Sequence, residues 1–187
     1  NSGRKNPNAS MTRIDIDKLV ITANTSIPPT ITYIPTPTPS PQSITIYEDT
    51  NPALVYTGSW YNWSDNNASG DSMHYTDNTS ASVRLTFYGT NFNFFYTPNF
   101  NKGVAEVFLD GLKINEIDMY SPTLQYQQKR SYQTSISDSM HTVEIRNSGR
   151  KNPNASMTRI DIDKIETIKS NTPFIPPPQL TLMPTSK

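Results

Sequence analysis

Cysteine is absent from this 187-residue chain, and histidine occurs only twice. Without cysteine, the chain can form neither disulfides nor thiolate metal sites. Charged side chains make up only 17% of the residues, and 16 basic residues balance 16 acidic ones. We therefore expect no basic surface for nucleic acid. No apolar run reaches the length of a membrane span, so we expect no transmembrane segment. The chain lacks a signal peptide and begins at Asn1, which indicates a processed product or a fragment.

Proline, serine, threonine, asparagine and tyrosine are abundant instead, with 16 prolines and 10 tyrosines. Proline removes a backbone donor and threonine is stiff at its first side-chain torsion, so this composition disfavours a helical fold. A polar but weakly charged chain of this kind is typical of an exposed extracellular β protein.

A long internal duplication is the strongest signal in the sequence. Asn1–Lys18 and Asn147–Lys164 both read NSGRKNPNASMTRIDIDK. The alternative to natural repetition is an artificial copy of one terminus. The following residues differ, Leu19–Thr22 against Ile165–Ile168, and an artificial copy would not have drifted. We therefore predict tandem repeats, each a domain followed by a linker.

Two proline-rich segments divide the chain. Residues 25–42 and 169–187 carry proline runs that favour extended, semi-rigid spacers. Residues 43–168 then form the domain, and residues 1–24 are the terminal strand of a preceding repeat or a strand lent to a neighbour. Threonine and serine between prolines also resemble O-glycosylated stalks. The predicted attachment sites are Thr36, Thr38 and Ser40.

Short alternating segments between these linkers predict strands. Ser43–Glu48 is the first, and apolar residues alternate with polar ones in Ala81–Tyr88. Asp110-Gly111 is a strong hairpin turn between two further strands. His74 lies in a strand-like segment, and Thr158–Lys164 is a late strand. Seven to nine such strands predict an all-β antiparallel sandwich, although local patterns do not separate a jelly roll from an immunoglobulin-like topology.

Several motifs resemble a family of bacterial surface modules. They are Tyr56–Trp60, Ala68–Tyr75, Gly103–Gly111, Asp118–Ser121, Gln125–Gln127, His141–Val143 and Arg159–Asp163. These modules are similar to galactose-binding-like jelly rolls of repeat-rich exported proteins. The resemblance implies a jelly-roll β-sandwich in a prokaryotic, extracellular or cell-surface protein. Members of this fold bind sugars, bind proteins or only space other domains.

Catalytic residues are not evident in the sequence. An enzyme needs a nucleophile with a base, or paired acids in a cleft. His74 and His141 both lie in or beside predicted strands, where a structural role is the better interpretation. Glu106, Glu116 and Asp118 belong to a hairpin that exposes ordinary carboxylates. We therefore predict that the protein is not an enzyme.

Aromatic residues in polar loops are candidates for sugar binding. The candidates are Trp60, Tyr61, Trp63, His74, Tyr75, Tyr120 and Gln125. The first three occupy a predicted loop rich in Asn and Asp. The alternative is that Trp60 plugs the end of the sandwich and Tyr120 packs under a loop.

Calcium needs several oxygen ligands, and related jelly rolls often hold a structural calcium. Asp65 and Asp71, with Asn66 and Asn67, are possible ligands, although no calcium-loop motif is complete. Asp161 and Asp163 point the same way from one strand, which is equally typical of a solvated face. We expect no other cofactor. The acceptor triplets for N-glycosylation begin at Asn8, Asn24, Asn62, Asn67, Asn78 and Asn154.

The predicted function is a structural repeat of an extracellular filament, stalk or surface-layer-like polymer. Its partners are copies of itself, joined head to tail through an inter-repeat strand, because an unpaired strand would leave an open edge and apolar side chains in water. This strand contains Met11, Arg13, Ile14, Ile16 and Leu19. The alternative is a carbohydrate-binding adhesin module whose partners are glycans.

Overall fold

The computed structural model describes residues 42–135 and 137–170. The first strands are β1 (Ser43–Glu48), β2 (Val55–Thr57), β3 (Tyr61–Ser64), β4 (Ser72–Thr76), β5 (Ser82–Gly89) and β6 (Asn91–Tyr96). The later strands are β7 (Gly103–Leu109), β8 (Leu112–Asp118), β9 (Gln128–Gln133), β10 (Ser139–Lys151), β11 (Ile160–Ile162) and β12 (Lys164–Lys169). One short 3₁₀ turn, Ser69–Asp71, separates β3 from β4. No helix in the described part of the chain is long and apolar enough to cross a membrane.

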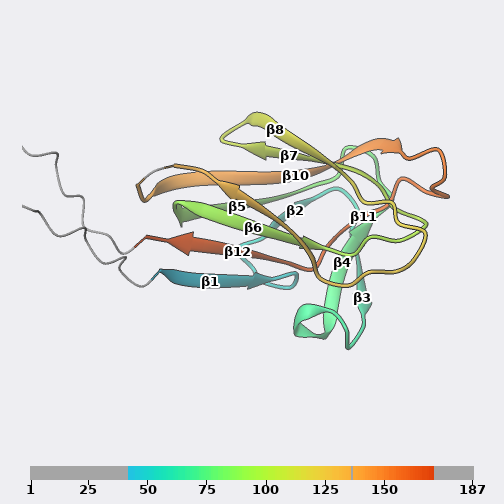
Figure 1. The fold of residues 1–187 in the computed structure, drawn as a ribbon, viewed down its shortest axis with the longest axis horizontal. Helices are drawn as coiled ribbons and strands as arrows, with labels where there is room; N and C mark the ends of the chain where they lie inside the picture. Colours follow the sequence, from blue (N-terminus) through green and yellow to red (C-terminus); the bar gives the residue numbers. More distant parts are fainter. Residues whose placement is uncertain (1–41, 136, 171–187) are drawn as a thin grey trace, which may run out of the picture. The chain divides into compact units, whose positions relative to one another are not determined.

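The strands form three antiparallel sheets (Figure 1). The first sheet has the order β1-β12-β6-β9, and the second has the order β2-β5-β10-β7-β8. These two sheets face each other across the core. A small third sheet, β11-β4-β3, lies at one end. The prediction of an all-β antiparallel sandwich is confirmed.

The core lies between the two large sheets and follows from their alternation. On β5, Val83, Leu85 and Phe87 are buried while the residues between them are exposed. Across the core, Phe92 and Phe94 of β6 are fully buried. Burying an apolar side chain of this size stabilises the fold by about 1.5–3 kcal/mol, so these strands anchor the sandwich.

The predicted Asp110-Gly111 turn joins β7 to β8. Both residues have positive φ, 50° and 84°, as a two-residue hairpin turn of this hand requires. Glycine adopts this conformation without strain, and aspartate tolerates it better than most residues. The turn chemistry therefore fixes the hairpin that the sequence predicted.

The second copy of the duplicated segment is fully used inside this sandwich. Asn147–Lys164 supplies the end of β10, all of β11 and the first residue of β12. Instead of the single strand that we expected over Thr158–Lys164, β11 pairs with β4 and β12 pairs with β1 and β6. Ile160 and Ile162 are fully buried, which confirms that this face is filled within its own domain. The first copy and its inter-repeat strand lie outside the described residues.

Several elements were not predicted. Tyr61–Ser64 forms strand β3 rather than a loop, and β2 and β9 carry too few apolar residues to signal a strand. The edge strand β1 pairs with β12 in antiparallel register from Ser43 with Lys169 to Glu48 with Lys164. Strand β1 therefore begins at the predicted start of the domain, residue 43, and β12 ends one residue beyond the predicted end of the domain, residue 168.

Candidate functional site

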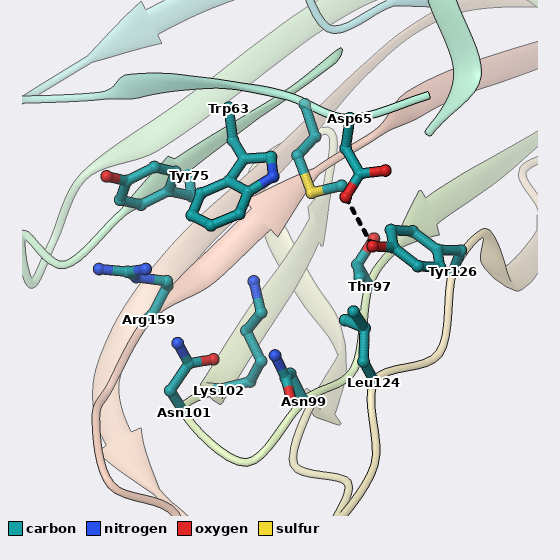
Figure 2. A pocket seen from close by; sticks show the side chains of 11 residues that line it. Trp63, Asp65, Tyr75, Thr97, Asn99, Asn101, Lys102, Leu124, Tyr126 and Arg159 are labelled. Atoms are coloured by element: carbon teal, nitrogen blue, oxygen red, sulfur yellow. Dashed lines mark hydrogen bonds between the residues drawn. The ribbon is translucent and has the colours of Figure 1, made fainter. Parts of the chain in front are cut away.

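A small pocket of about 80 Å³, partly open to solvent, lies beside the small third sheet (Figure 2). The β3–β4 hairpin forms one wall, and the segment after β6 forms the floor. The loop before β9 closes the rim. Small-molecule sites are commonly aromatic with a few placed polar groups, and the lining of this small pocket has both.

The wall is aromatic because the β3–β4 pairing puts alternate residues on one face. Tyr61 lies opposite Tyr75, and Trp63 lies opposite Met73. Trp63 is 51% exposed, and its ring centre is 6.4 Å from that of Tyr75. The guanidinium of Arg159 lies 4.1 Å from the centre of the Tyr75 ring and is bonded to Asp77 at 2.7 and 2.9 Å. The cation and the paired strands thus hold the wall in place.

The floor is polar and buried. The ammonium of Lys102 donates to the carboxylate of Asp161, and both side chains are almost fully buried. The other oxygen of Asp161 accepts from the backbone N–H of Thr97 at 2.8 Å. A buried ion pair of this kind needs such extra hydrogen bonds to offset its desolvation.

Two floor oxygens have no hydrogen-bond partner among the described residues. They are Oγ1 of Thr97 and Oδ1 of Asn101, and both are buried. A buried polar atom without a partner costs free energy, so these two oxygens are a local cost in the floor. Figure 2 shows Asn99, Asn101 and Lys102 on the side of the pocket opposite Trp63 and Tyr75.

The rim is held by Asp65. Its Oδ2 accepts from the Tyr126 hydroxyl at 2.6 Å, and its Oδ1 accepts from the backbone and side-chain N–H groups of Asn67 at 3.0 and 2.9 Å. The hydrogen bond from Tyr126, and then those from Asn67, lower the pKa of Asp65. The hydrogen bond to Asp65 in turn raises the pKa of Tyr126. Asp65 therefore stays ionised near neutral pH and ties the β3–β4 loop to the loop before β9.

The sequence-predicted sugar contacts separate into two groups. Trp63 and Tyr75 line the pocket, and Tyr61 extends the same aromatic face, 5.5 Å from Tyr75. Trp60 instead packs on the core and donates to the carbonyl of Thr57 at 3.1 Å, which matches the alternative that it plugs the sandwich.

The remaining candidates lie outside the pocket lining. His74 bonds to buried Asp49 at 2.7 Å and stacks on Tyr56. Gln125 donates to Ser121, and Tyr120 pairs with Asn99 in an isolated bridge. Sequence reasoning missed several residues that line the pocket, namely Thr97, Asn99, Asn101, Lys102, Leu124, Tyr126 and Arg159. The polar segment after β6 was the available signal for the floor.

The expected calcium ligands Asp65 and Asp71 stay a prediction, and the structure places them in different surroundings. Both oxygens of Asp65 already face hydrogen-bond donors, and Asp71 is exposed. Asp161 and Asp163 are fully buried, so they do not form the solvated face that the sequence allowed. Burial, with nearby Asp161 and Glu48, raises the pKa of Asp163 to about 6. Within the described residues, no three His, Cys, Asp or Glu side chains converge as a metal site.

His141 lies at the other end of the sandwich in a row with Asp110 and Ser139. Its Nδ1 is 2.7 Å from Asp110 Oδ2, and its Nε2 is 2.7 Å from Ser139 Oγ. This is the order of contacts in a Ser–His–Asp triad. Asp110 also accepts from the backbone N–H of Thr142 at 2.8 Å. The row thus fastens the β7–β8 turn to β10, consistent with the structural role expected for His141.

Two curated relatives, both from Flavonifractor plautii, resemble part of the chain. An A type blood N-acetyl-alpha-D-galactosamine deacetylase is 31% identical over 107 residues, which are 57% of this chain and 14% of the relative. An A type blood alpha-D-galactosamine galactosaminidase is 40% identical over 78 residues, 41% of this chain and 7% of the relative. The chain thus spans only a small part of either protein. No protein-family model matches it.

Solved structures support the fold. A Paenibacillus xanthan lyase superposes with a TM-score of 0.55 at 20% identity, over 72% of this chain and 14% of that one. A two-domain esterase active on acetylated mannans also gives 0.55, at 13% identity, over 69% of this chain and 37% of that one. At these identities the likeness concerns the β-sandwich alone.

These comparisons correct the prediction that the protein is not an enzyme. Both curated relatives are named as enzymes. The filament role gains no support from them. The chain is similar to modules of carbohydrate-active enzymes.

Proposed function

We propose that residues 43–168 are a carbohydrate-binding module of a larger carbohydrate-active enzyme, and that the glycan occupies the pocket between Trp63 and Asn101. The observation that carries the proposal is the pairing of an exposed aromatic wall with a polar floor in one pocket. The module would hold the enzyme on its substrate, in an extracellular prokaryotic setting.

Sugar chemistry suits both sides of the pocket. A pyranose presents a weakly positive C–H face, which complements the negative face of an indole or phenol ring. Its hydroxyls are donors as well as acceptors, so they can pair with the polar side chains that line the floor, such as Asn99 and Asn101. The ammonium of Lys102 has three N–H groups, one of which is directed to Asp161. A sugar hydroxyl can accept a hydrogen bond from one of the other two N–H groups of Lys102.

The charges of the pocket favour a neutral or amino sugar over an acidic one. Lys102 is paired with Asp161 and Arg159 with Asp77, so Asp65 supplies an unbalanced negative charge. The two curated relatives are named for acting on N-acetyl-α-D-galactosamine and α-D-galactosamine. Glycans that end in these two sugars are therefore the first probes, with a polyuronate as the disfavoured comparison.

Tryptophan fluorescence and calorimetry on the 187-residue chain test the proposal. The chain has two tryptophans, so Trp60→Phe leaves Trp63 as the sole reporter. We expect a bound glycan to change its emission saturably. Trp63→Ala should lower affinity at least about 10-fold, or 1.4 kcal/mol. Asn101→Ala should also weaken binding. The matched control is Tyr88→Ala, which removes an aromatic that is 50% exposed and outside the pocket.

Binding that survives Trp63→Ala and Asn101→Ala unchanged would place the glycan elsewhere. No saturable binding across a broad neutral-glycan array would remove the proposal altogether.

We further propose a tandem arrangement of this module in the parent protein. The duplicate of Asn147–Lys164 at the N-terminus supports it, because the second copy already fills its own sandwich. The segment with Met11, Ile14 and Ile16 would then complete a preceding module, in the same chain or in a neighbouring copy. Light scattering on the isolated chain distinguishes these two arrangements, because only insertion of the segment into a neighbouring copy gives concentration-dependent assembly.

Glycosylation remains part of this proposal. Asn62, Asn67 and Asn78 are exposed, as glycan acceptors must be. Thr36, Thr38 and Ser40 lie outside the described residues. The intact mass of native material should exceed the 21.0 kDa of the bare chain, and an unmodified mass would exclude these modifications.

A further inference from the structure

A second hollow, wider and more open than the sugar pocket, measures about 430 Å³. Its lining is polar apart from one methionine and consists of Asp77, Lys151, Ser156, Met157 and Thr158. The sugar pocket itself measures about 80 Å³, whereas sites that enclose a small molecule usually measure about 300–1,000 Å³. The pocket therefore admits only part of a glycan, and the rest of the glycan must lie on the neighbouring surface.

One ion pair separates the pocket from the second hollow. Arg159 lines the pocket, and its guanidinium lies 4.1 Å from the centre of the Tyr75 ring. The same guanidinium donates to both carboxylate oxygens of Asp77, at 2.9 and 2.7 Å, and Asp77 lines the hollow. Figure 2 shows Arg159 and Tyr75 at the side of the pocket away from Tyr126. A glycan that leaves the pocket over Arg159 therefore enters the second hollow.

The lining of the second hollow suits a neutral sugar. The side-chain hydroxyls of Ser156 and Thr158 make no hydrogen bond with other residues in the described part of the chain, so each can donate to or accept from a sugar hydroxyl. The Lys151 ammonium is held by two backbone carbonyls, at 2.7 and 3.3 Å, and the carboxylate of Asp77 already has its counter-ion. Met157 is 47% exposed and offers an adaptable apolar side chain to the C–H face of a sugar.

The loop that builds the second hollow is identical in both copies of the duplicated segment. Residues 152–158 repeat residues 6–12 letter for letter, although Ala155 is the only buried residue among them. The strand that follows has drifted. Residues 165–168 of β12 align with residues 19–22 without one identity, even though Ile165 and Thr167 are buried. Loops ordinarily vary more than the elements that they connect, so an unchanged exposed loop indicates binding rather than packing.

Hydrogen bonds hold this loop in shape. The backbone N–H of Ala155 donates to the carbonyl of Asn152 at 2.9 Å, and the backbone N–H of Ser156 donates to the carbonyl of Phe100 at 3.0 Å. The side-chain amide of Asn152 donates to Asp118 at 2.8 Å. A loop that is already fixed loses little conformational freedom when a ligand binds, which favours affinity.

We propose that the second hollow is a sugar subsite, and that the module binds an oligosaccharide of at least two neutral sugar residues across the ion pair of Arg159 and Asp77. One sugar lies against Trp63 in the pocket, and the next lies against Met157 with its hydroxyls toward Ser156 and Thr158. This inference rests on the proposed function, because the hollow extends a pocket that must itself bind sugar.

Calorimetry on the 187-residue chain with glycans of increasing length tests the subsite. The probes are N-acetyl-α-D-galactosamine and a disaccharide and a trisaccharide that end in it. We expect the disaccharide to bind at least about 10-fold more tightly than the monosaccharide. Met157→Ala and Ser156→Ala should each reduce this gain about 3-fold or more and leave the affinity for the monosaccharide unchanged. The matched control is Met140→Ala, which removes a methionine that is 61% exposed and outside both hollows.

The outcomes separate the subsite from the pocket. If the monosaccharide binds and Trp63→Ala weakens it, but longer glycans gain nothing, the subsite is wrong while the proposed function stands. A length-dependent gain that persists in Met157→Ala and Ser156→Ala also overturns the subsite. So does concentration-dependent assembly that Met157→Ala abolishes without any change in glycan affinity, because the loop would then contact another copy of the chain. If no member of the series binds, the subsite is wrong, and the neutral-glycan array decides whether the proposed function fails with it.

Discussion

The buried ion pair of Lys102 and Asp161 gives the sharpest stability prediction. Lys102→Met keeps the aliphatic stem of the side chain but leaves the Asp161 carboxylate buried and uncompensated, since the side chain of Asp161 has no exposed area. Removing one partner of a buried pair costs about 3–5 kcal/mol. For a domain of this size we expect Tm to fall by roughly 10–20 °C.

A double-mutant cycle tests the reasoning. Asp161→Asn keeps an oxygen to accept from the Thr97 N–H, and Lys102→Met with Asp161→Asn removes both charges together. The double variant should recover most of the stability that Lys102→Met loses, because no buried charge remains. Urea unfolding at pH 7 measures all four proteins. A loss below about 1 kcal/mol in Lys102→Met, or a double variant as unstable as the single one, would refute the interpretation of Lys102 as the counter-ion of a desolvated carboxylate.

Three further predictions concern other parts of the sandwich. Hydrogen bonds from Arg146 and then Arg84 lower the pKa of Glu144 to about 2. The ionised Glu144 carboxylate therefore stabilises the fold above the pKa that this group has in the unfolded chain, and the stabilisation is lost as pH falls toward 2. Glu144→Gln should therefore lower the free energy of unfolding by about 1–2 kcal/mol at pH 7, a modest value because both arginines are partly exposed. Urea unfolding measures the difference between the wild type and the variant, and a difference that does not shrink between pH 6 and pH 3 would contradict this. A Cβ on Gly103 would lie 2.5 Å from the carbonyl oxygen of Thr158, so Gly103→Ala should destabilise the fold by about 1–3 kcal/mol. An unchanged Tm would show that the backbone at the start of β7 can shift to accommodate the methyl group. Trp60→Ala should destabilise by about 1–3 kcal/mol because the ring packs on the core, whereas Trp63→Ala should change stability by less than about 0.5 kcal/mol because its ring is exposed. Calorimetric scans in which Trp63→Ala is the less stable variant would show that Trp63, and not Trp60, supports the core.

Local alternation accounts for the parts of the fold that were predictable. On β5 the alternation between Val83 and Phe87 repeats every second residue, and the Asp110-Gly111 turn needs only its own two residues. These signals depend on neighbours along the chain, so a sequence reveals them. Strand β3 escaped prediction because all four of its residues are exposed and its pairing with β4 supplies the order.

The candidate site was less predictable because its chemistry depends on distant contacts. Lys102 is buried only because Asp161 comes from another strand to meet it. Asp161 and Asp163 are both buried because both faces of β11 are covered, so the expected solvated face does not exist. The sequence identified Trp63 and Tyr75 as candidates, yet it offered Trp60 equally, and only packing separates them.

The register of the first strand with the last has a mechanical consequence. Ser43 and Lys169 are paired at the end of the sandwich away from the pocket, so the chain enters and leaves side by side (Figure 1). Tension applied through both linkers would separate β1 from β12 one hydrogen bond at a time, because the antiparallel bonds lie along the direction of pulling. Tension between a bound glycan and one linker would run along the strands and load many bonds at once. The same domain would then yield easily when stretched within its chain and resist when it holds its parent protein to a polysaccharide.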